Sequence, residues 1–214
     1  MEGIVSLKPL YDFARKYPHN EAAIKVDRTT TLGNEYRRKC AALIESVPRE
    51  QGLYLWGFYN ANGFWTNIYV GKTERGTSSN LYTRLYKELT AERACIWREV
   101  YTYKQLRQIC NRIHPPQTRK ANLRAWDRHV EKAGATHIFW IALPSKDSAE
   151  LKAIEKDLIE SMNPTGNRQR ATPPEHLRED TKQAFGFLRE MIHRDENRRS
   201  RFRLDLHKNF WKTL

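Results

Sequence analysis

Cysteine is scarce in this sequence. Only three of its 214 residues are cysteines, Cys40, Cys95 and Cys110, and no two of them form a CxxC pair. An odd number of cysteines without paired spacing favours neither a disulfide framework nor a zinc site. We therefore expect a protein of a reducing cytoplasm that binds no zinc.

Long apolar segments are also missing. No run of about eighteen consecutive apolar residues occurs, and the opening segment MEGIVSLKPLYDFARKYP lacks the apolar stretch of a signal peptide. Internal repeats and linker-like segments of low complexity are absent as well. These absences predict a protein that is neither exported nor inserted in a membrane, and the length fits one domain with extensions.

Acidic residues are few relative to basic ones. The chain has 25 Asp and Glu against 38 Lys and Arg, a net charge of +13. Such an excess favours capture of nucleic acid, whereas binding to a membrane surface would need a basic amphipathic helix that no segment clearly offers. A merely basic surface explains the same excess, so the charge predicts nucleic-acid binding but not catalysis.

Apolar periodicity predicts a mixed α+β fold around three strands. Residues 52–59 (GLYLWGFY) and 67–73 (NIYVGKT) are rich in aromatic and β-branched side chains and predict a β-hairpin. Residues 137–143 (HIFWIAL) predict a buried third strand. Apolar residues at helical spacing predict helices over 80–89 and 145–162, which would flank the strands.

Three segments are predicted to decorate or interrupt a core of residues 51–168. Residues 1–50 predict a helical N-terminal extension with a polar loop at 27–33. Residues 91–135 predict a basic helical insertion, with ten basic and four acidic residues. Residues 169–214 predict a basic helical C-terminal arm.

One acidic residue falls on the apolar side of the predicted helix over 148–162. With Leu151 at zero, Glu155 projects at about 40°, between Met162 and Ile159, while the other acids of the helix project elsewhere. A carboxylate on a core-facing stripe needs a metal ion, an arginine or backbone donors as its partner. A metal ligand and a buried Glu–Arg pair are both open at this point.

Two tyrosines lie within the predicted strands, and each is followed closely by glycine. Gly71, after Tyr69, would let a phosphate approach the backbone, and Lys72 adds a positive charge there. A phenol is a poor base near neutral pH unless a cation eases its ionisation, and we expect Lys72 and Arg84 to do so for Tyr54. An ordinary aromatic hairpin is the alternative.

The order of these residues resembles the motif that gives the GIY-YIG nucleases their name. Gly52-Leu53-Tyr54 precedes Ile68-Tyr69-Val70-Gly71-Lys72, and the resemblance covers roughly residues 50–168. Arg84 resembles the family's phosphate-binding arginine, Glu155 its metal-binding glutamate, and Asn167 its terminal asparagine, which is otherwise a turn residue. One departure is Glu88, which stands where the family often has His or Tyr; Tyr82 or Tyr86 could take that role instead.

The resemblance implies a small three-stranded antiparallel sheet and one divalent cation, Mg²⁺ or Mn²⁺, held mainly by Glu155 with water and phosphate oxygens. It implies that Tyr54 is the general base, and that Arg84 and the metal neutralise charge on the phosphate. Tyr69 and Lys72 would position the attacking water or stabilise the ionised Tyr54. Asn167 would orient neighbouring groups by hydrogen bonding.

The expected activity is hydrolysis of phosphodiester bonds in double-stranded DNA, in the form of a type II restriction endonuclease of bacterial or phage origin. One site per chain cuts two strands most simply in a two-fold homodimer. A DNA repair or structure-selective nuclease of the same family is the first alternative, and a non-catalytic nucleic-acid-binding protein is the second. The recognition sequence, the cut position and the response to methylation do not follow from the sequence.

DNA recognition is expected to involve the basic insertion. Arginine reads guanine in the major groove, and it also binds phosphates without sequence preference, so both kinds of contact are open. The candidates for DNA contact are Arg107, Arg112, Arg119, Arg124 and Arg128.

Overall fold

Four strands form one antiparallel sheet. The computed structural model describes residues 1–16, 30–60, 62–73, 80–90, 134–164, 167 and 176–212, with side chains as far as residue 199. In these ranges the strand order is β1-β4-β2-β3, and each neighbouring pair is antiparallel. The strands are β1 (Glu2–Ser6), β2 (Gly52–Tyr59), β3 (Trp65–Lys72) and β4 (His137–Ala142).

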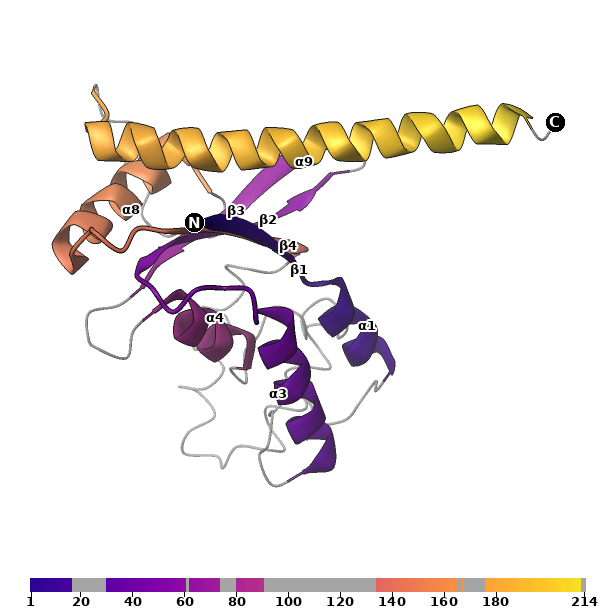
Figure 1. Cartoon of the computed structure of the whole chain (residues 1–214), viewed down its shortest axis with the longest axis horizontal. Coiled ribbons are helices and arrows are strands. Elements are labelled where there is room, and N and C mark those ends of the chain that lie inside the picture. The colour runs from indigo at the N-terminus through magenta and orange to yellow at the C-terminus, as the bar shows by residue number, and fades with distance from the viewer. Residues whose placement is uncertain are drawn as a thin grey trace, which may run out of the picture.

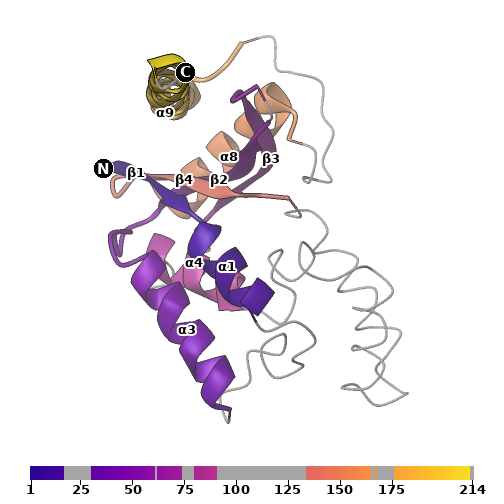
Figure 2. The ribbon, with the colours of Figure 1, turned by 90° about the vertical axis from the view of Figure 1, so that its right-hand side faces the viewer.

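Helices cover both faces of the sheet (Figures 1 and 2). One face carries α1 (Lys8–Lys16), α3 (Thr31–Leu43) and α4 (Leu81–Thr90), and the other carries α8 (Ser148–Met162) and α9 (Glu179–Lys212). The predicted α+β class is confirmed. The predicted hairpin, the strand that follows it in the chain and the two flanking helices are also present, with small differences at their ends.

The sheet has one strand more than the three that the sequence predicts. The additional strand, β1, lies in the segment predicted to be helical, and it pairs with β4 from Glu2↔Ile141 to Ser6↔His137. Five residues are too few for a period of two to stand out beside the helical pattern that begins at Leu7. The N-terminal segment is therefore not wholly helical, because it adds an edge strand to the sheet.

Helix α3 begins inside the polar loop predicted over 27–33. Thr30 is its N-cap, and the Thr30 hydroxyl accepts a hydrogen bond from the Gly33 backbone N–H at 3.0 Å. A threonine in this place satisfies a donor that the first helical turn leaves unpaired. The loop prediction is therefore wrong at its end, where Gly33 is a helical residue.

Alternating side chains of β2 fill two hydrophobic cores. Tyr54 and Trp56 join the cluster formed with α1, α3 and α4, while Leu53 and Leu55 join the cluster formed with α8 and α9. Successive residues of a strand point to opposite faces, so a strand buried on both faces is apolar almost throughout. Each fully buried large apolar side chain contributes about 1.5–3 kcal/mol, and together these side chains fix where β2 presents Tyr54.

Helix α8 is fixed at both ends. The Asp147 carboxylate accepts hydrogen bonds from the backbone N–H groups of Ala149 and Glu150, and the Glu150 carboxylate accepts one from the Asp147 N–H at 2.7 Å. Asn163 ends the helix in the left-handed conformation, with φ of 42°. These caps fix the rotation of the helix about its axis. They therefore also fix the direction of the Glu155 side chain, which turns toward β3.

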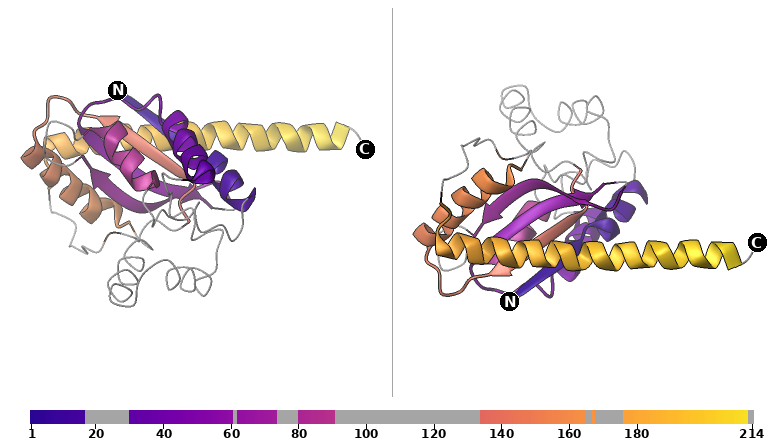
Figure 3. Two further views of the ribbon diagram at one scale, coloured as in Figure 1. Left: turned by 90° about the horizontal axis from the view of Figure 1, so that it is seen from below. Right: turned by 90° about the horizontal axis from the view of Figure 1, so that it is seen from above.

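Helix α9 crosses the sheet and continues beyond it (Figure 3). It packs on α8 and β4, and its buried residues in this contact are Ala184, Leu188 and Met191. The segment predicted as a helical C-terminal arm is thus helical from Glu179 onward. None of the helices in the described ranges is both long enough and apolar enough to cross a membrane.

Candidate functional site

Five of the six predicted site residues are connected through Arg84, which contacts Tyr54 and lies within electrostatic reach of Glu155. Tyr54 comes from β2, Tyr69 and Lys72 from β3, Arg84 from α4 and Glu155 from α8. The ring centroids of Tyr54 and Tyr69 are 6.5 Å apart, and Arg84 Nε lies 3.1 Å from the Tyr54 hydroxyl. Glu155 is close enough to Lys72 and Arg84 for both charges to act on it. The fold therefore gathers residues that lie as far as 101 positions apart in the sequence.

The Tyr54 hydroxyl is hydrogen-bonded on two sides. It donates to Glu88 Oε1 at 2.7 Å and accepts from Arg84 Nε at 3.1 Å. Arg84 Nε also lies 3.0 Å from the same Glu88 oxygen. The three side chains therefore form one closed group, in which Tyr54 is only 1% exposed.

This arrangement disfavours the ionised form of Tyr54. Burial raises the pKa of Tyr54 well above its ordinary value, Glu88 raises it further, and Arg84 opposes the rise without cancelling it. Arg84 eases the ionisation of Tyr54, as expected, but burial and the Glu88 carboxylate outweigh it, and Lys72 is not among the groups that act on Tyr54. Tyr54 is a protonated donor to Glu88.

Glu88 is the site residue that the sequence does not assign. It follows Arg84 by one helical turn, so the two side chains share a face of α4, and the Glu88 side chain is 10% exposed. Tyr82 and Tyr86, the alternatives for this role, stack on each other with ring centroids 6.3 Å apart. The four-residue spacing of Arg84 and Glu88 is visible in the sequence and predicts that the two side chains are neighbours on one helix. Their contact with Tyr54 is not visible there, because only the fold brings Tyr54 to them.

Glu155 is half-buried and makes no hydrogen bond or ion pair within the described ranges. Burial raises the pKa of Glu155, while Lys72 and Arg84 oppose the rise. The buried Glu–Arg pair that the sequence left open is not formed with Arg84, which contacts Tyr54 and Glu88. Glu155 is therefore an oxygen donor that remains available beside two cations.

The projection around α8 does not predict the burial of Glu160, another acid of this helix. Glu160 is predicted to point away from the core, yet it is 9% exposed, and its carboxylate lies 3.7 Å from Lys156 Nζ. Spacing along a helix records only the stripe that faces the main core. It does not record burial that arises elsewhere on the helix surface.

A divalent cation fits the donor chemistry at Glu155. Carboxylate oxygens are hard ligands, and Mg²⁺ commonly keeps several waters and uses one or two protein carboxylates together with substrate phosphates. Across the described ranges, no three His, Cys, Asp or Glu side chains are grouped so that they could hold a metal by themselves. Glu155 would therefore hold such an ion together with water and phosphate oxygens.

Asn167 is bonded to the edge of the sheet. Its Oδ1 accepts from the Val70 N–H at 2.8 Å, and its Nδ2 donates to the Val70 carbonyl at 2.9 Å. The amide thus pairs with β3 as a further strand would. Asn167 meets the cluster through the backbone beside Tyr69, and not through the side chains of the other site residues.

Replacing Asn167 with alanine is expected to lower the free energy of unfolding by about 1–3 kcal/mol, because both backbone groups of Val70 lose their partner. Equilibrium denaturation in urea measures the loss. Asn197→Ala is the matched control, since Asn197 is an exposed residue of α9, and we expect it to change stability by no more than about 0.5 kcal/mol. Equal stability of the two variants would show that the bonds to Val70 contribute nothing net.

Gly71 leaves the space that Tyr54 occupies. The two residues are partners in the β2–β3 ladder, and a Cβ on Gly71 would lie 2.5 Å from both the Cζ and the hydroxyl oxygen of Tyr54. Real Cβ atoms do not approach other atoms so closely, so a side chain at this position would displace the ring. The glycine is required here by a close approach and not by a left-handed backbone.

Gly71→Ala is therefore expected to destabilise the chain by about 1–3 kcal/mol and to move the Tyr54 hydroxyl away from Glu88. Urea denaturation and the near-ultraviolet signal of the tyrosines measure the two effects. The control is Gly186→Ala on α9, where a Cβ meets nothing within 4 Å and alanine is expected to stabilise the helix by about 0.5–1 kcal/mol. If Gly71→Ala is as stable as Gly186→Ala, the close approach does not restrict this position.

The residues proposed for DNA contact cannot be placed relative to this cluster. The predicted insertion over 91–135 lies outside the described residues except for its last two positions. The five arginines in question, Arg107, Arg112, Arg119, Arg124 and Arg128, lie in the part that is not described.

Comparisons with known proteins give no relative for this chain. No family model matches the sequence, and neither a curated protein nor a solved structure gives a significant match.

Proposed function

We propose that the chain is a divalent-metal-dependent endonuclease of the GIY-YIG kind that hydrolyses phosphodiester bonds of double-stranded DNA. The observation behind this proposal is Glu155, a half-buried carboxylate with no partner in the described ranges, beside Lys72 and Arg84. Glu155 supplies an oxygen ligand for a metal, Lys72 and Arg84 supply cations for a phosphate, and the Tyr54–Glu88 hydrogen bond supplies a route for a proton. The net charge of +13 suits a nucleic-acid substrate.

Glu155, Lys72 and Arg84 would act on the phosphate, Glu155 by holding a metal ion and the other two by their own charge. Mg²⁺ or Mn²⁺ bound at Glu155 would polarise the scissile phosphate and stabilise the negative charge that grows on it. Lys72 and Arg84 add two positive charges beside the same group, so the phosphate is held where the charge develops. Tyr69 lies against the Tyr54 ring and limits how that ring can turn.

Tyr54 and Glu88 act on the attacking water. The water oxygen bonds to phosphorus as the bond from phosphorus to the 3′ oxygen breaks, and the 3′ oxygen leaves with the bonding electron pair and takes up a proton from solvent water. The proton of the attacking water moves to the Tyr54 oxygen as the Tyr54 proton passes to Glu88. This coupled transfer follows from the raised pKa of Tyr54, since a lasting phenolate is disfavoured while Glu88 lies 2.7 Å away as an acceptor. Glu88 is thus the final acceptor of the proton.

We further propose that the enzyme is a type II restriction endonuclease that works in the cytoplasm as a two-fold homodimer. One site per chain must cut both strands of a duplex, and two copies related by symmetry do so most simply. A repair or structure-selective nuclease would use the same chemistry on a different form of DNA, so the substrate decides between them.

The activity is tested by incubating plasmid DNA with the purified chain in Mg²⁺ and, in parallel, in EDTA. We expect cleavage with the metal and none with the chelator. Discrete bands from unmodified plasmid support the restriction enzyme, whereas a preference for branched or damaged duplexes supports the repair nuclease. Binding without cleavage in both Mg²⁺ and Mn²⁺ would contradict the proposal and leave a non-catalytic nucleic-acid-binding protein.

A further inference from the structure

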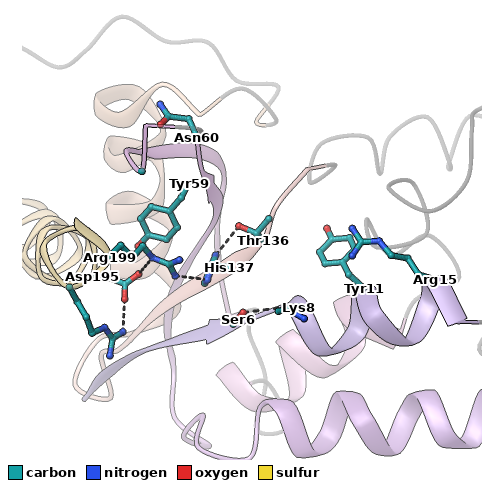
Figure 4. A pocket seen from close by; sticks show the side chains of 12 residues that line it. Ser6, Lys8, Tyr11, Arg15, Tyr59, Asn60, Thr136, His137, Asp195 and Arg199 are labelled. Carbon is teal, nitrogen blue, oxygen red and sulfur yellow. Dashed lines mark hydrogen bonds and ion pairs between the residues drawn. The ribbon is translucent and has the colours of Figure 1, made fainter. Parts of the chain in front are cut away.

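A cavity of about 750 Å³ lies at the end of β2 that is remote from Tyr54 (Figure 4). It is lined by residues of α1, the β2–β3 turn, the start of β4 and α9, and we call it the α1–α9 cavity. Tyr59 in its wall is five residues along β2 from Tyr54, which is about 17 Å at the rise of a strand. None of the candidate site residues lines this cavity, so it needs an explanation of its own.

The α1–α9 cavity is basic. Its lining has one carboxylate, Asp195, against four cations, which are Lys8, Arg15, Arg198 and Arg199. Asp12 lies outside the lining but pairs with Lys8 and Arg15, and with it included the net charge is still +2. The side chains of Lys8, Arg15 and Arg198 are 64–76% exposed, so they can turn toward a ligand. A concave surface of one sign concentrates ions of the other sign.

Arg199 is held in a fixed orientation at this cavity. Its Nε donates to Asp195 Oδ2 at 2.7 Å, its Nη2 donates to His137 Nε2 at 2.8 Å, and its guanidinium lies 3.9 Å from the centre of the Tyr59 ring. The contacts to Asp195 and His137 use Nε and one N–H of Nη2, and a guanidinium has five N–H donors in all. A guanidinium that is already oriented loses little conformational freedom when a ligand binds, and it keeps donors for that ligand.

The partners of Arg199 keep their charge states over a wide pH range. Burial alone would raise the pKa of Asp195, but its hydrogen-bonding neighbours, both arginines among them, lower it to about 2. Burial and Arg199 lower the pKa of His137 to about 4, so the ring is neutral near pH 7 and its Nε2 can accept from Arg199. Near pH 7 Asp195 is thus ionised and His137 neutral, and both can hold Arg199.

We propose that the α1–α9 cavity is a phosphate-binding site in which Arg199 is the fixed anchor and Lys8, Arg15 and Arg198 close on the ligand. The planar fork of a guanidinium matches two oxygens of a phosphate, and the net charge of the cavity is balanced by one doubly charged free phosphate or by two singly charged backbone phosphates. The phosphate comes from a nucleic-acid backbone or from a free molecule such as a nucleotide. In the first case, a distance of about 17 Å from Tyr54 corresponds to about five base pairs along a duplex.

The test measures binding in EDTA, where metal-dependent cleavage does not occur, so a failure of the nuclease proposal leaves the outcome readable. The cavity variants are Arg199→Lys, which keeps the charge but removes the fork, and Lys8→Ala. Lys8 is an exposed residue that pairs with Asp12 on the surface of α1, so this variant serves if Arg199→Lys does not fold. The control is Arg189→Ala, which removes one exposed charge of α9 outside the cavity.

Two probes separate the two sources of phosphate. The first probe is inorganic phosphate at constant ionic strength. If the site binds free phosphate, this probe should raise the Tm of the wild type and of Arg189→Ala. The cavity variants should then bind phosphate about tenfold more weakly, with their affinity for a duplex unchanged. The second probe is a short DNA duplex. If the site binds a backbone phosphate, the cavity variants should bind the duplex about tenfold more weakly than the control does. The slope of log binding constant against log salt concentration should also become shallower by about 0.9 for each lost phosphate contact. The proposal is overturned if the cavity variants bind both probes as Arg189→Ala does.

Discussion

Replacing Glu155 with glutamine is expected to slow Mg²⁺-dependent cleavage by about a thousandfold or more, because a bound metal contributes several kcal/mol to catalysis and this change removes its protein ligand. Glutamine keeps the size and polarity of the side chain while losing the charge that attracts the ion. The rate is measured on plasmid DNA under single-turnover conditions, with the chain in excess over the DNA.

Glu160→Gln is the matched control, since it makes the same charge change on the same helix, at a residue that pairs with Lys156.

The stability of Glu155→Gln supplies a second readout. Burial raises the pKa of Glu155, so its charge opposes folding near pH 7, and Glu155→Gln is expected to unfold in EDTA at an equal or higher urea concentration than the wild type. A carboxylate with a structural role would give the opposite change. Cleavage by Glu155→Gln at the rate of Glu160→Gln would contradict the metal-binding role.

Replacing Glu88 with glutamine is expected to slow cleavage by about 10²–10⁴-fold, the usual contribution of a positioned proton acceptor. The amide oxygen of glutamine still accepts the hydrogen bond that Tyr54 donates, which is 2.7 Å long in the wild type, so the ring stays in place. The amide does not take up the proton. Because burial keeps the pKa of Tyr54 high, the proton of the attacking water then lacks its route.

A double mutant distinguishes this relay from two separate roles. Tyr54→Phe interrupts the same route, so Tyr54→Phe combined with Glu88→Gln should be no slower than the slower single variant. Glu45→Gln, at an exposed residue after α3, controls for the change in charge. Losses that multiply would show that Tyr54 and Glu88 act independently. A wild-type rate in Glu88→Gln would show that the proton does not pass to this carboxylate.

The elements that carry the candidate site follow from local sequence, whereas β1 does not. β2 is buried on both faces, so its eight residues form a run that only a strand explains. β1 is an edge strand of five residues that gives one fully buried side chain, Val5, to one core and a partly buried one, Ile4, to the other. So few buried positions leave no pattern, and its pairing with β4 arises from the whole fold.

The membership of the site is easier to predict than its chemistry. Tyr54, Arg84 and Glu155 are grouped in the sequence by the resemblance of their order to the GIY-YIG motif, and not by the lengths of the predicted strands and helices. The order of the residues does not predict whether the pKa of Tyr54 is raised or lowered, because this shift depends on how deeply α4 and β2 bury the hydroxyl. Glu88 acquires its role in the same way, through a contact across 34 positions of sequence.

The outer edge of β3 is occupied by side chains from later segments of the chain. Asn167 takes both backbone groups of Val70, and Glu196 of α9 accepts from the Trp65 N–H at 2.7 Å. An uncovered edge strand recruits strands from other molecules and starts aggregation. The contacts that hold β3 beside Tyr54 therefore also obstruct templated association between copies of the chain, and Asn167→Ala should precipitate more readily than the wild type during refolding at high concentration.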